Sequence, residues 1–188
     1  MNDETNAKST SGGMFGHIMR RLLHVSIILI PIIYYCFINS KIVVCALLVV
    51  LVIFEAWRIY NKKVLFGQRK HEFNHISSFA WGLFAAGLVL LFAPKAFAYP
   101  ILISCAIVDP LLGEIRQFEI SKYIIAFIGV AVTILIWYAL QHCLPTAWYW
   151  PLIMGPIIVA SEWPNLRYID DNAMMQLVPL ILVIMFVI

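Results

Sequence analysis

The residues with the clearest chemical potential lie just before the last apolar segment of the chain. There, a glutamate precedes two consecutive aspartates and an asparagine: Glu162, Asp170, Asp171 and Asn172. One aspartate could simply cap the following helix, because aspartate side chains accept hydrogen bonds from the free amides of a helix start and suit the positive end of its dipole. Capping accounts for one acid only. Carboxylate and amide oxygens are hard ligands that suit Mg²⁺, so this group predicts a metal-dependent site.

Asp109 is a further candidate, because it follows an apolar run at residues 101–108 and directly precedes Pro110. An ionisable group at membrane depth costs about 2.5–3.5 kcal/mol on insertion scales, and a proline removes a helical hydrogen bond. This combination is typical of a residue that lines a cavity. The alternative is that Asp109 lies at the membrane surface and pairs with Arg116.

Two basic motifs could contact phosphate, RRLLH at residues 20–24 and GQRKHEFNH at residues 67–75. For the first motif, the alternative is a pair of arginines that reach toward anionic headgroups beside a packed histidine. For the second, it is a solvated connector on the positively charged side of a membrane. The candidate phosphate contacts within these motifs are Arg20, Arg21, His24, Arg69 and Glu72.

The chain that positions these residues has the composition of a membrane protein. It has 188 residues, of which 63% are hydrophobic and only 12% are charged. These values exclude a secreted disulfide scaffold, a disordered regulator and an ordinary cytosolic enzyme, and a net charge of +3 gives no indication of nucleic-acid binding. Four scattered cysteines without a C-x-x-C pair argue against a zinc site or a disulfide framework. We expect a flexible cytoplasmic tail at residues 1–16 and one transmembrane catalytic domain at residues 17–188.

The apolar windows predict an all-α, polytopic helical bundle. Crossing about 30 Å of hydrocarbon takes roughly 20 helical residues, and about seven windows of this kind occur along the chain. The expected spans are residues 22–39, 41–57, 76–94, 97–113, 123–141, 147–161 and 173–188. The last window is short and contains Pro179, so it could be tilted, kinked or only partly spanning.

The basic residues predict the orientation of these spans. Of the 13 Lys and Arg residues, all but Lys41 and Lys95 fall on one side of the expected bundle. The positive-inside rule places that side, and with it the N-terminus, in the cytoplasm. The candidate acids fall on the same side. We therefore expect an integral membrane protein, of a prokaryotic plasma (inner) membrane given its compact size, with an active site that faces the cytoplasm.

At these motifs the sequence resembles the polyprenol kinase family of integral membrane enzymes, which includes dolichol kinase, phytol kinase and CTP-dependent diacylglycerol kinase. The family's opening pattern of two basic residues, two apolar residues and a histidine is similar to residues 20–24, and its R-x-x-E element is similar to residues 69–72. A membrane-embedded aspartate of the family is similar to Asp109. The closing acid and Asp-Asp-Asn run of the family are similar to Glu162 and residues 170–172, and this is the most specific match.

The resemblance implies a kinase that uses Mg²⁺ to transfer the γ-phosphate of CTP or ATP to the hydroxyl of a polyprenol-type or other lipid alcohol. It implies catalytic roles for Asp109, Asp170, Asp171 and Glu162, with the three aspartates also as metal ligands. The nucleotide and phosphate contacts that it implies are Arg20, Arg21, His24, Arg69, Glu72, Arg116 and Asn172. Family members carry a glycine-rich loop after the membrane aspartate, and this chain lacks it; Arg116 and Lys122 could serve in its place. The competing readings are a CDP-lipid-forming nucleotidyltransferase and a diverged membrane protein without catalysis, such as a transporter or a partner protein. The sequence does not indicate an oligomeric state.

Overall fold

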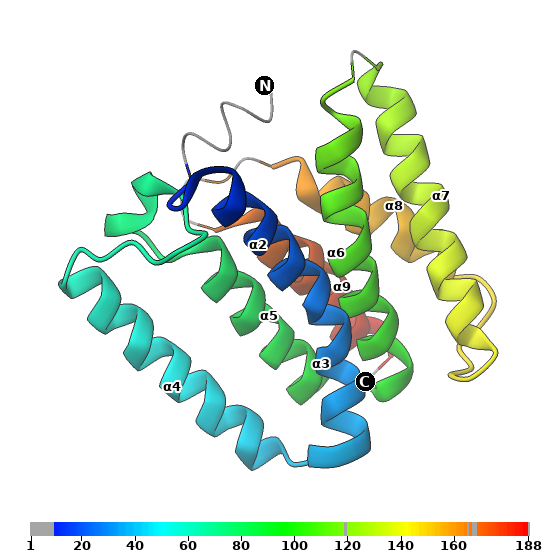
Figure 1. Cartoon of the computed structure of the whole chain (residues 1–188). Coiled ribbons are helices and arrows are strands. Elements are labelled where there is room, and N and C mark those ends of the chain that lie inside the picture. Colours follow the sequence, from blue (N-terminus) through cyan, green and yellow to red (C-terminus); the bar gives the residue numbers. More distant parts are fainter. Residues whose placement is uncertain (1–9, 119, 165, 167–168, 188) are drawn as a thin grey trace.

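A computed structural model of the chain describes residues 10–118, 120–164, 166 and 169–187. Within these residues every regular element is a helix, as the sequence predicts (Figure 1). The helices are α2 (Gly13–Val25), α3 (Leu29–Ile33), α4 (Lys41–Tyr60), α5 (Ser78–Phe92), α6 (Lys95–Ile115), α7 (Lys122–Gln141), α8 (Trp150–Glu162) and α9 (Asp171–Phe186). Short turns of other helix types, η1 (Ser26–Ile28) and η2 (Tyr34–Ile38), continue α2 and α3 as one segment, and η3 (Lys70–Asn74) lies between α4 and α5.

Each expected window corresponds to one helical segment, but only four of these segments are long and apolar enough to cross a membrane. They are Gly13–Ile38, Lys41–Tyr60, Lys95–Ile115 and Lys122–Gln141. The remaining three are apolar but shorter, at 15 residues in α5, 13 in α8 and 16 in α9. Proline limits the length of α5, because Pro94 follows its C-cap residue Ala93. Pro179, in contrast, lies inside α9 without ending it. The structure thus shows four full-length candidate spans within a seven-helix bundle.

The first helix begins earlier than the sequence indicates, because a connector holds the segment before it. Helix α2 starts at Gly13, inside the stretch assigned above to a flexible tail. The amide of Gly67 donates a hydrogen bond of 3.0 Å to the carbonyl of Ser11, and the rings of Phe15 and Phe66 lie 5.7 Å apart. The part of the chain just before α2 is therefore attached to the α4–α5 connector, which also carries candidate site residues.

Helix α6 is the central element of the bundle. It packs against α2, α5, α7, α8 and α9, and several of its apolar side chains are fully buried, including Ile101, Leu102, Val108 and Leu112. Helix α4, in contrast, packs mainly on α5 and leaves most of its apolar side chains exposed. Such exposure on a helix of this length is expected when the surrounding solvent is lipid. The position of α6 places Asp109, near its end, among the surrounding helices.

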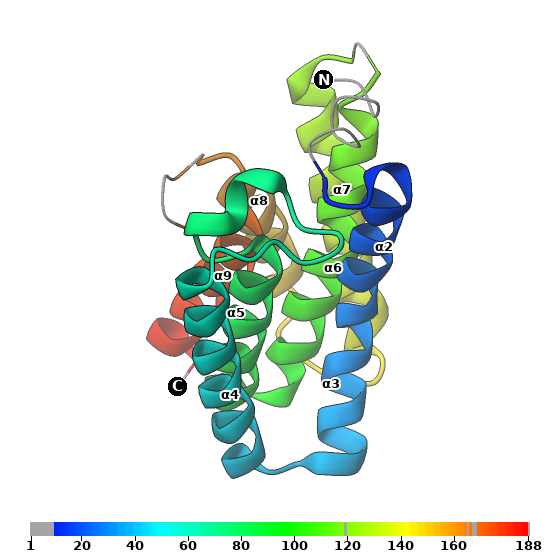
Figure 2. The ribbon, with the colours of Figure 1, turned by 60° about the vertical axis from the view of Figure 1, so that its left-hand side comes forward.

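The direction of the helices brings the candidate residues to one end of the bundle. Successive helices run in alternate directions, so the starts of α2, α5, α7 and α9 meet the ends of α4, α6 and α8 (Figure 1). A second view shows the same arrangement, with the connector between α4 and α5 lying over this end (Figure 2). The motifs at residues 67–75 and 170–172 occur at these starts and ends, whereas residues 20–24 lie inside α2 and Asp109 lies inside α6.

Glycines allow close helix contacts, and one of them gives a stability prediction. A Cβ atom added at Gly155 of α8 would lie 2.7 Å from the Cγ1 atom of Ile134 and 3.3 Å from the backbone oxygen of Val130 in α7. We expect Gly155→Ala to lower the free energy of unfolding by about 1–3 kcal/mol, the usual cost of overpacking. Gly113→Ala is the matched control, because no atom lies within 4 Å of its added Cβ. Thermal unfolding in detergent measures both, and equal midpoints for the two variants would contradict the prediction.

Candidate functional site

Two adjoining cavities open at the end of the bundle where the motifs meet. The large cavity has a volume of about 1180 Å³ and the small cavity about 190 Å³. Arg69, Arg116 and Asp171 line both of them. Every candidate site residue named from the sequence lines one or both cavities. Candidate residues far apart in the sequence, such as Arg20 and Asn172, are thereby brought to one site.

The two aspartates at the start of α9 are fixed by its first turn. A side-chain oxygen of Asp170 accepts hydrogen bonds from the backbone amide of Asn172, at 3.1 Å, and from its side-chain amide, at 2.8 Å. Asp171 accepts from the same backbone amide at 2.9 Å. The capping alternative is therefore confirmed for Asp170. Both carboxylates also line the large cavity, so capping of α9 is compatible with a function in the cavity.

Burial and the repulsion between neighbouring carboxylates shift the pKa values of the acids just before α9. Burial, followed by the charges of Asp170 and Asp109, raises the pKa of Asp171 to about 8. Burial alone would raise the pKa of Asp170, but hydrogen bonds with Asp171, Ser78 and Asn172 outweigh it and lower that pKa below its usual value. Two neighbouring carboxylates that cannot both ionise freely are a typical environment for a cation or for proton transfer.

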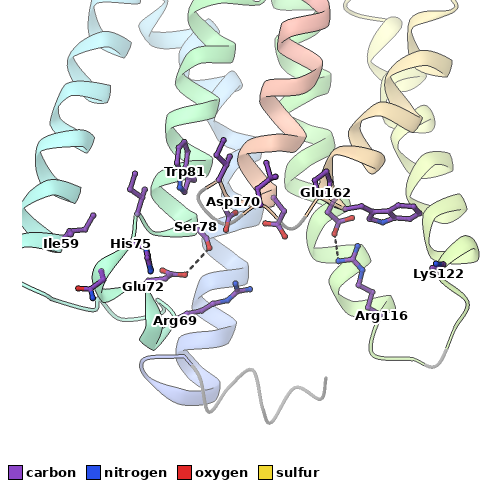
Figure 3. A pocket seen from close by; sticks show the side chains of 17 residues that line it. Ile59, Arg69, Glu72, His75, Ser78, Trp81, Arg116, Lys122, Glu162 and Asp170 are labelled. Atoms are coloured by element: carbon purple, nitrogen blue, oxygen red, sulfur yellow. Dashed lines mark hydrogen bonds and ion pairs between the residues drawn. The ribbon is translucent and has the colours of Figure 1, made fainter.

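Asp109 and Arg116 do not form the pair that the sequence suggested as an alternative. Asp109 instead lies beside His24, whose Nε2 atom is 3.5 Å from an Asp109 oxygen. Arg116 instead pairs with Glu162 at 2.8 Å, across the gap between α6 and α8 (Figure 3). Burial raises the pKa of Glu162 to about 7, and Arg116 acts in the opposite direction. Arg21 pairs with Glu114.

Ser78 connects two of the motifs and was not identified from the sequence. Its hydroxyl donates to an oxygen of Glu72 at 3.3 Å (Figure 3). It also acts on the Asp170 carboxyl, whose pKa it lowers. Ser78 is the first residue of α5, where the neighbouring Ser77 supplies the cap. The pair of serines at a helix start was the available signal, but it indicates only capping. The link between the R-x-x-E element and the Asp-Asp-Asn run depends on the packing of α5 against α9.

A buried ion pair behind the site holds the connector that carries Arg69 and Glu72. Arg58, at the end of α4, is 0% exposed and pairs with Glu55. Its guanidinium also donates to the backbone carbonyls of Glu72, at 2.9 Å, and of His75. Glu55 accepts from the backbone amide of Ser77 at 3.1 Å and from its hydroxyl. Since neither Glu55 nor Arg58 lines a cavity, the pair positions the site from outside.

The acidic residues fit a magnesium ion that is shared with a phosphate. Among the described residues, no group of three His, Cys, Asp or Glu side chains is arranged to hold a metal ion by itself. Mg²⁺ in phosphoryl-transfer sites is usually bound by one or two carboxylates together with substrate phosphates. Asp170 and Asp171 supply such carboxylates, and the buried Oδ1 atom of Asn172 has no hydrogen-bond partner. The donor set is therefore suitable for Mg²⁺ held jointly with phosphate.

Fold and site together define an all-α integral membrane protein with a charged, two-part cavity at one end of its bundle. A scan against protein-family models, a search of curated proteins and a search of solved structures each found no match to this chain. The four cysteines are free. The large cavity combines cations, carboxylates and apolar side chains in its lining.

Proposed function

We propose that the protein is a membrane lipid kinase, which transfers the γ-phosphate of CTP or ATP to the hydroxyl of a polyprenol-type or other lipid alcohol. One observation carries the proposal. The carboxylates and cations of all the candidate motifs, which the resemblance to polyprenol kinases assigns to such a reaction, line two adjoining cavities. Phosphoryl transfer needs positioning and charge neutralisation more than covalent chemistry, and these cavities supply both kinds of charge.

The lengths of the helices support a site at the membrane surface. In this proposal all seven helical segments lie in the membrane, with the N-terminus in the cytoplasm, and four of them are long enough to cross it fully. At 1.5 Å per residue, the 21 residues of α6 extend about 31 Å, whereas the 13 residues of α8 extend only about 20 Å. In Figure 1 the hairpin of α6 and α7 projects beyond the end of α8. The floor of the large cavity is therefore recessed, which allows a soluble nucleotide to reach a lipid hydroxyl at the interface.

The proposed chemistry assigns a role to each group. The lipid hydroxyl oxygen attacks the γ-phosphorus, the bond from that phosphorus to the β–γ bridging oxygen breaks, and the nucleoside diphosphate leaves. A carboxylate of the cavity takes the hydroxyl proton. Bound Mg²⁺ would neutralise charge on the β- and γ-phosphates. The residues that would hold it, together with phosphate oxygens, are Asp170 and Asp171 with the Oδ1 atom of Asn172.

Cations of the cavities hold the phosphates, whereas the acids beside them keep those cations in place. The cations are Arg20, Arg21, Arg69 and Arg116. Glu162 orients Arg116 through their ion pair. Glu72 lies beside Ser78, and Asn172 orients Asp170 through its two hydrogen bonds.

Arg116→Gln should weaken nucleotide binding. Hydrogen bonds to charged groups contribute about 1.5–3 kcal/mol, so we expect the KM for the nucleotide to rise about 10- to 100-fold while the KM for the lipid alcohol stays the same. Steady-state rates with each substrate varied in turn measure both constants. Lys63→Gln is the matched control, because Lys63 is an exposed cation outside both cavities. A rise in the lipid KM alone would contradict a phosphate role for Arg116.

Two labelled nucleotides test the proposed reaction against nucleotidyl transfer. Purified protein in lipid vesicles is incubated with Mg²⁺, phosphatidic acid, a polyprenol and CTP that carries the label on either the γ- or the α-phosphate. Movement of the γ-label alone into a lipid supports the kinase. Movement of the α-label, with release of pyrophosphate, would instead show a CDP-lipid-forming enzyme and would contradict the proposal.

A further inference from the structure

The three candidate aspartates are divided between the two cavities. Asp109 lines only the small cavity, Asp170 lines only the large cavity, and Asp171 lines both. The arginines of the RRLLH motif, Arg20 and Arg21, line only the small cavity. The two cavities therefore present different surfaces that meet at Asp171. A reaction with two substrates of different chemistry requires an arrangement of this kind.

The small cavity suits phosphate groups and little else. Its volume of about 190 Å³ lies below the roughly 300–1,000 Å³ of pockets that hold drug-sized ligands, so a nucleoside or a lipid chain does not fit within it. Four guanidinium groups and His24 line it. Arginine forks match phosphate oxygens in geometry and charge. The phosphate chain of a nucleotide is the part of either substrate that this surface can hold.

One wall of the large cavity suits an alcohol with a long apolar chain. Ser78 and Trp81 are three residues apart and so lie on one face of α5, with Trp81 deeper in the bundle (Figure 3). Ser78 is bound to Asp170 at the polar edge. Ile59 of α4 and Ile76 continue the apolar surface beside Trp81. A polar edge followed by an apolar wall is complementary to a hydroxyl group followed by a hydrocarbon chain.

The opposite wall of the large cavity carries charged side chains instead of apolar ones. Arg116, Lys122 and Glu162 lie on the far side of Asp170 from Trp81 (Figure 3). The apolar wall also adjoins surface that faces lipid in the proposed arrangement, since Ile76 is 44% exposed and the last turns of α4 carry exposed apolar side chains. A lipid can reach the apolar wall directly from the bilayer, whereas a nucleotide meets cations on the other side.

From these surfaces we infer that the acceptor alcohol binds on the α4–α5 side of the large cavity, its hydroxyl against Ser78 and Asp170 and its chain along Trp81. The phosphate chain of the donor occupies the small cavity, and the two substrates meet at Asp171. This assignment rests on the proposed function. It makes Trp81 a residue that binds the acceptor, and it makes Arg20 a residue that binds the donor.

Photolabelling tests the acceptor position without any turnover. The probe is a long-chain polyprenol with a diazirine close to its hydroxyl, added to the full-length protein in vesicles, with unlabelled polyprenol as competitor. We expect competable crosslinks in the end of α4 and the start of α5, around Ile59 and Trp81. Crosslinks confined to α2 and α6, or none that polyprenol displaces, would overturn the assignment. Labelling at α5 in a protein that transfers no phosphate would uphold the alcohol site and reject the kinase proposal.

Kinetics of two variants test the division between donor and acceptor. Loss of a large apolar side chain that contacts the ligand costs binding energy in proportion to the apolar area that the ligand covers, so Trp81→Ala should raise the KM for the alcohol about tenfold or more and leave the nucleotide KM unchanged. Arg20→Gln should raise the KM for the nucleotide and leave the KM for the alcohol unchanged. Trp148→Ala, at a tryptophan that is 70% exposed and lines neither cavity, is the matched control. A Trp81→Ala variant that changes only the nucleotide KM would overturn the assignment, and Trp81→Phe gives the same test if the alanine variant does not fold.

Discussion

Replacement of Asp171 by asparagine should lower the rate of lipid phosphorylation by about 10²–10³-fold, the usual effect of removing one preorganised charge-stabilising group from an active site. Asp171 is the one candidate aspartate that lines both cavities, so the loss of its ionisable carboxyl group affects the place where the two substrates meet. Asparagine has almost the same shape, and Asp170 still caps α9. The fold should therefore be preserved. Initial rates with γ-labelled nucleotide measure the effect, and thermal unfolding checks the fold.

A charge-retaining variant separates the role of the charge from that of position. Asp171→Glu keeps the carboxylate but displaces it by one methylene group, so it should retain more activity than Asp171→Asn while remaining slower than the native protein. Equal losses in the two variants would indicate that position dominates. A native rate in Asp171→Asn would contradict any catalytic or metal-binding role for this residue.

Loss of the Arg58 side chain should destabilise the protein more than any change at the cavity surface. Arg58→Met leaves Glu55 buried without its cation and frees the carbonyls of Glu72 and His75. Removing one partner of a buried ion pair costs about 3–5 kcal/mol, and thermal unfolding in detergent should show a correspondingly lower midpoint. Because the same contacts hold the connector with Arg69, the variant should also bind nucleotide less well.

A double variant distinguishes the ion pair from simple packing. Glu55→Met combined with Arg58→Met removes both charges, so we expect it to be more stable than Arg58→Met alone. Arg58→Lys keeps the charge but lacks the fork that reaches several carbonyls, and it should be intermediate in stability. If the double variant were less stable than Arg58→Met, Glu55 would stabilise the fold even without Arg58. That result would contradict the claim that an unpaired Glu55 is destabilising.

The helices and the end of the bundle where the site forms could be predicted from the sequence, because both follow from local rules. Apolar windows locate helices whatever the tertiary packing, and alternate crossing directions bring every second connection to the same end. This is why residues 20–24 meet residues 170–172 as expected. Helix lengths were less predictable. The windows at residues 76–94, 147–161 and 173–188 contain shorter helices than a full span, since caps and turns rather than hydrophobicity set the helix ends.

The partners of individual charged residues could not be predicted, because they depend on distances between helices. Spacing alone offered Arg116 as a partner for Asp109, yet Arg116 reaches Glu162 on another helix. Ser78 joins two motifs only because α5 packs on α9. The attachment of the segment before α2 to Gly67 likewise needs a contact between distant parts of the chain, for which neither segment carries a local signal.

The most direct test of the central claim is the transfer of labelled phosphate to a lipid. Purified full-length protein in vesicles would be incubated with Mg²⁺, γ-labelled CTP or ATP, and a panel of polyprenols, phytol and diacylglycerol, with Asp171→Asn as the parallel control. We expect label to appear in one class of lipid alcohol with the native protein and to be almost absent with the variant. No labelled lipid from the folded protein with either nucleotide and any of these alcohols would contradict the assignment of this site to a lipid kinase.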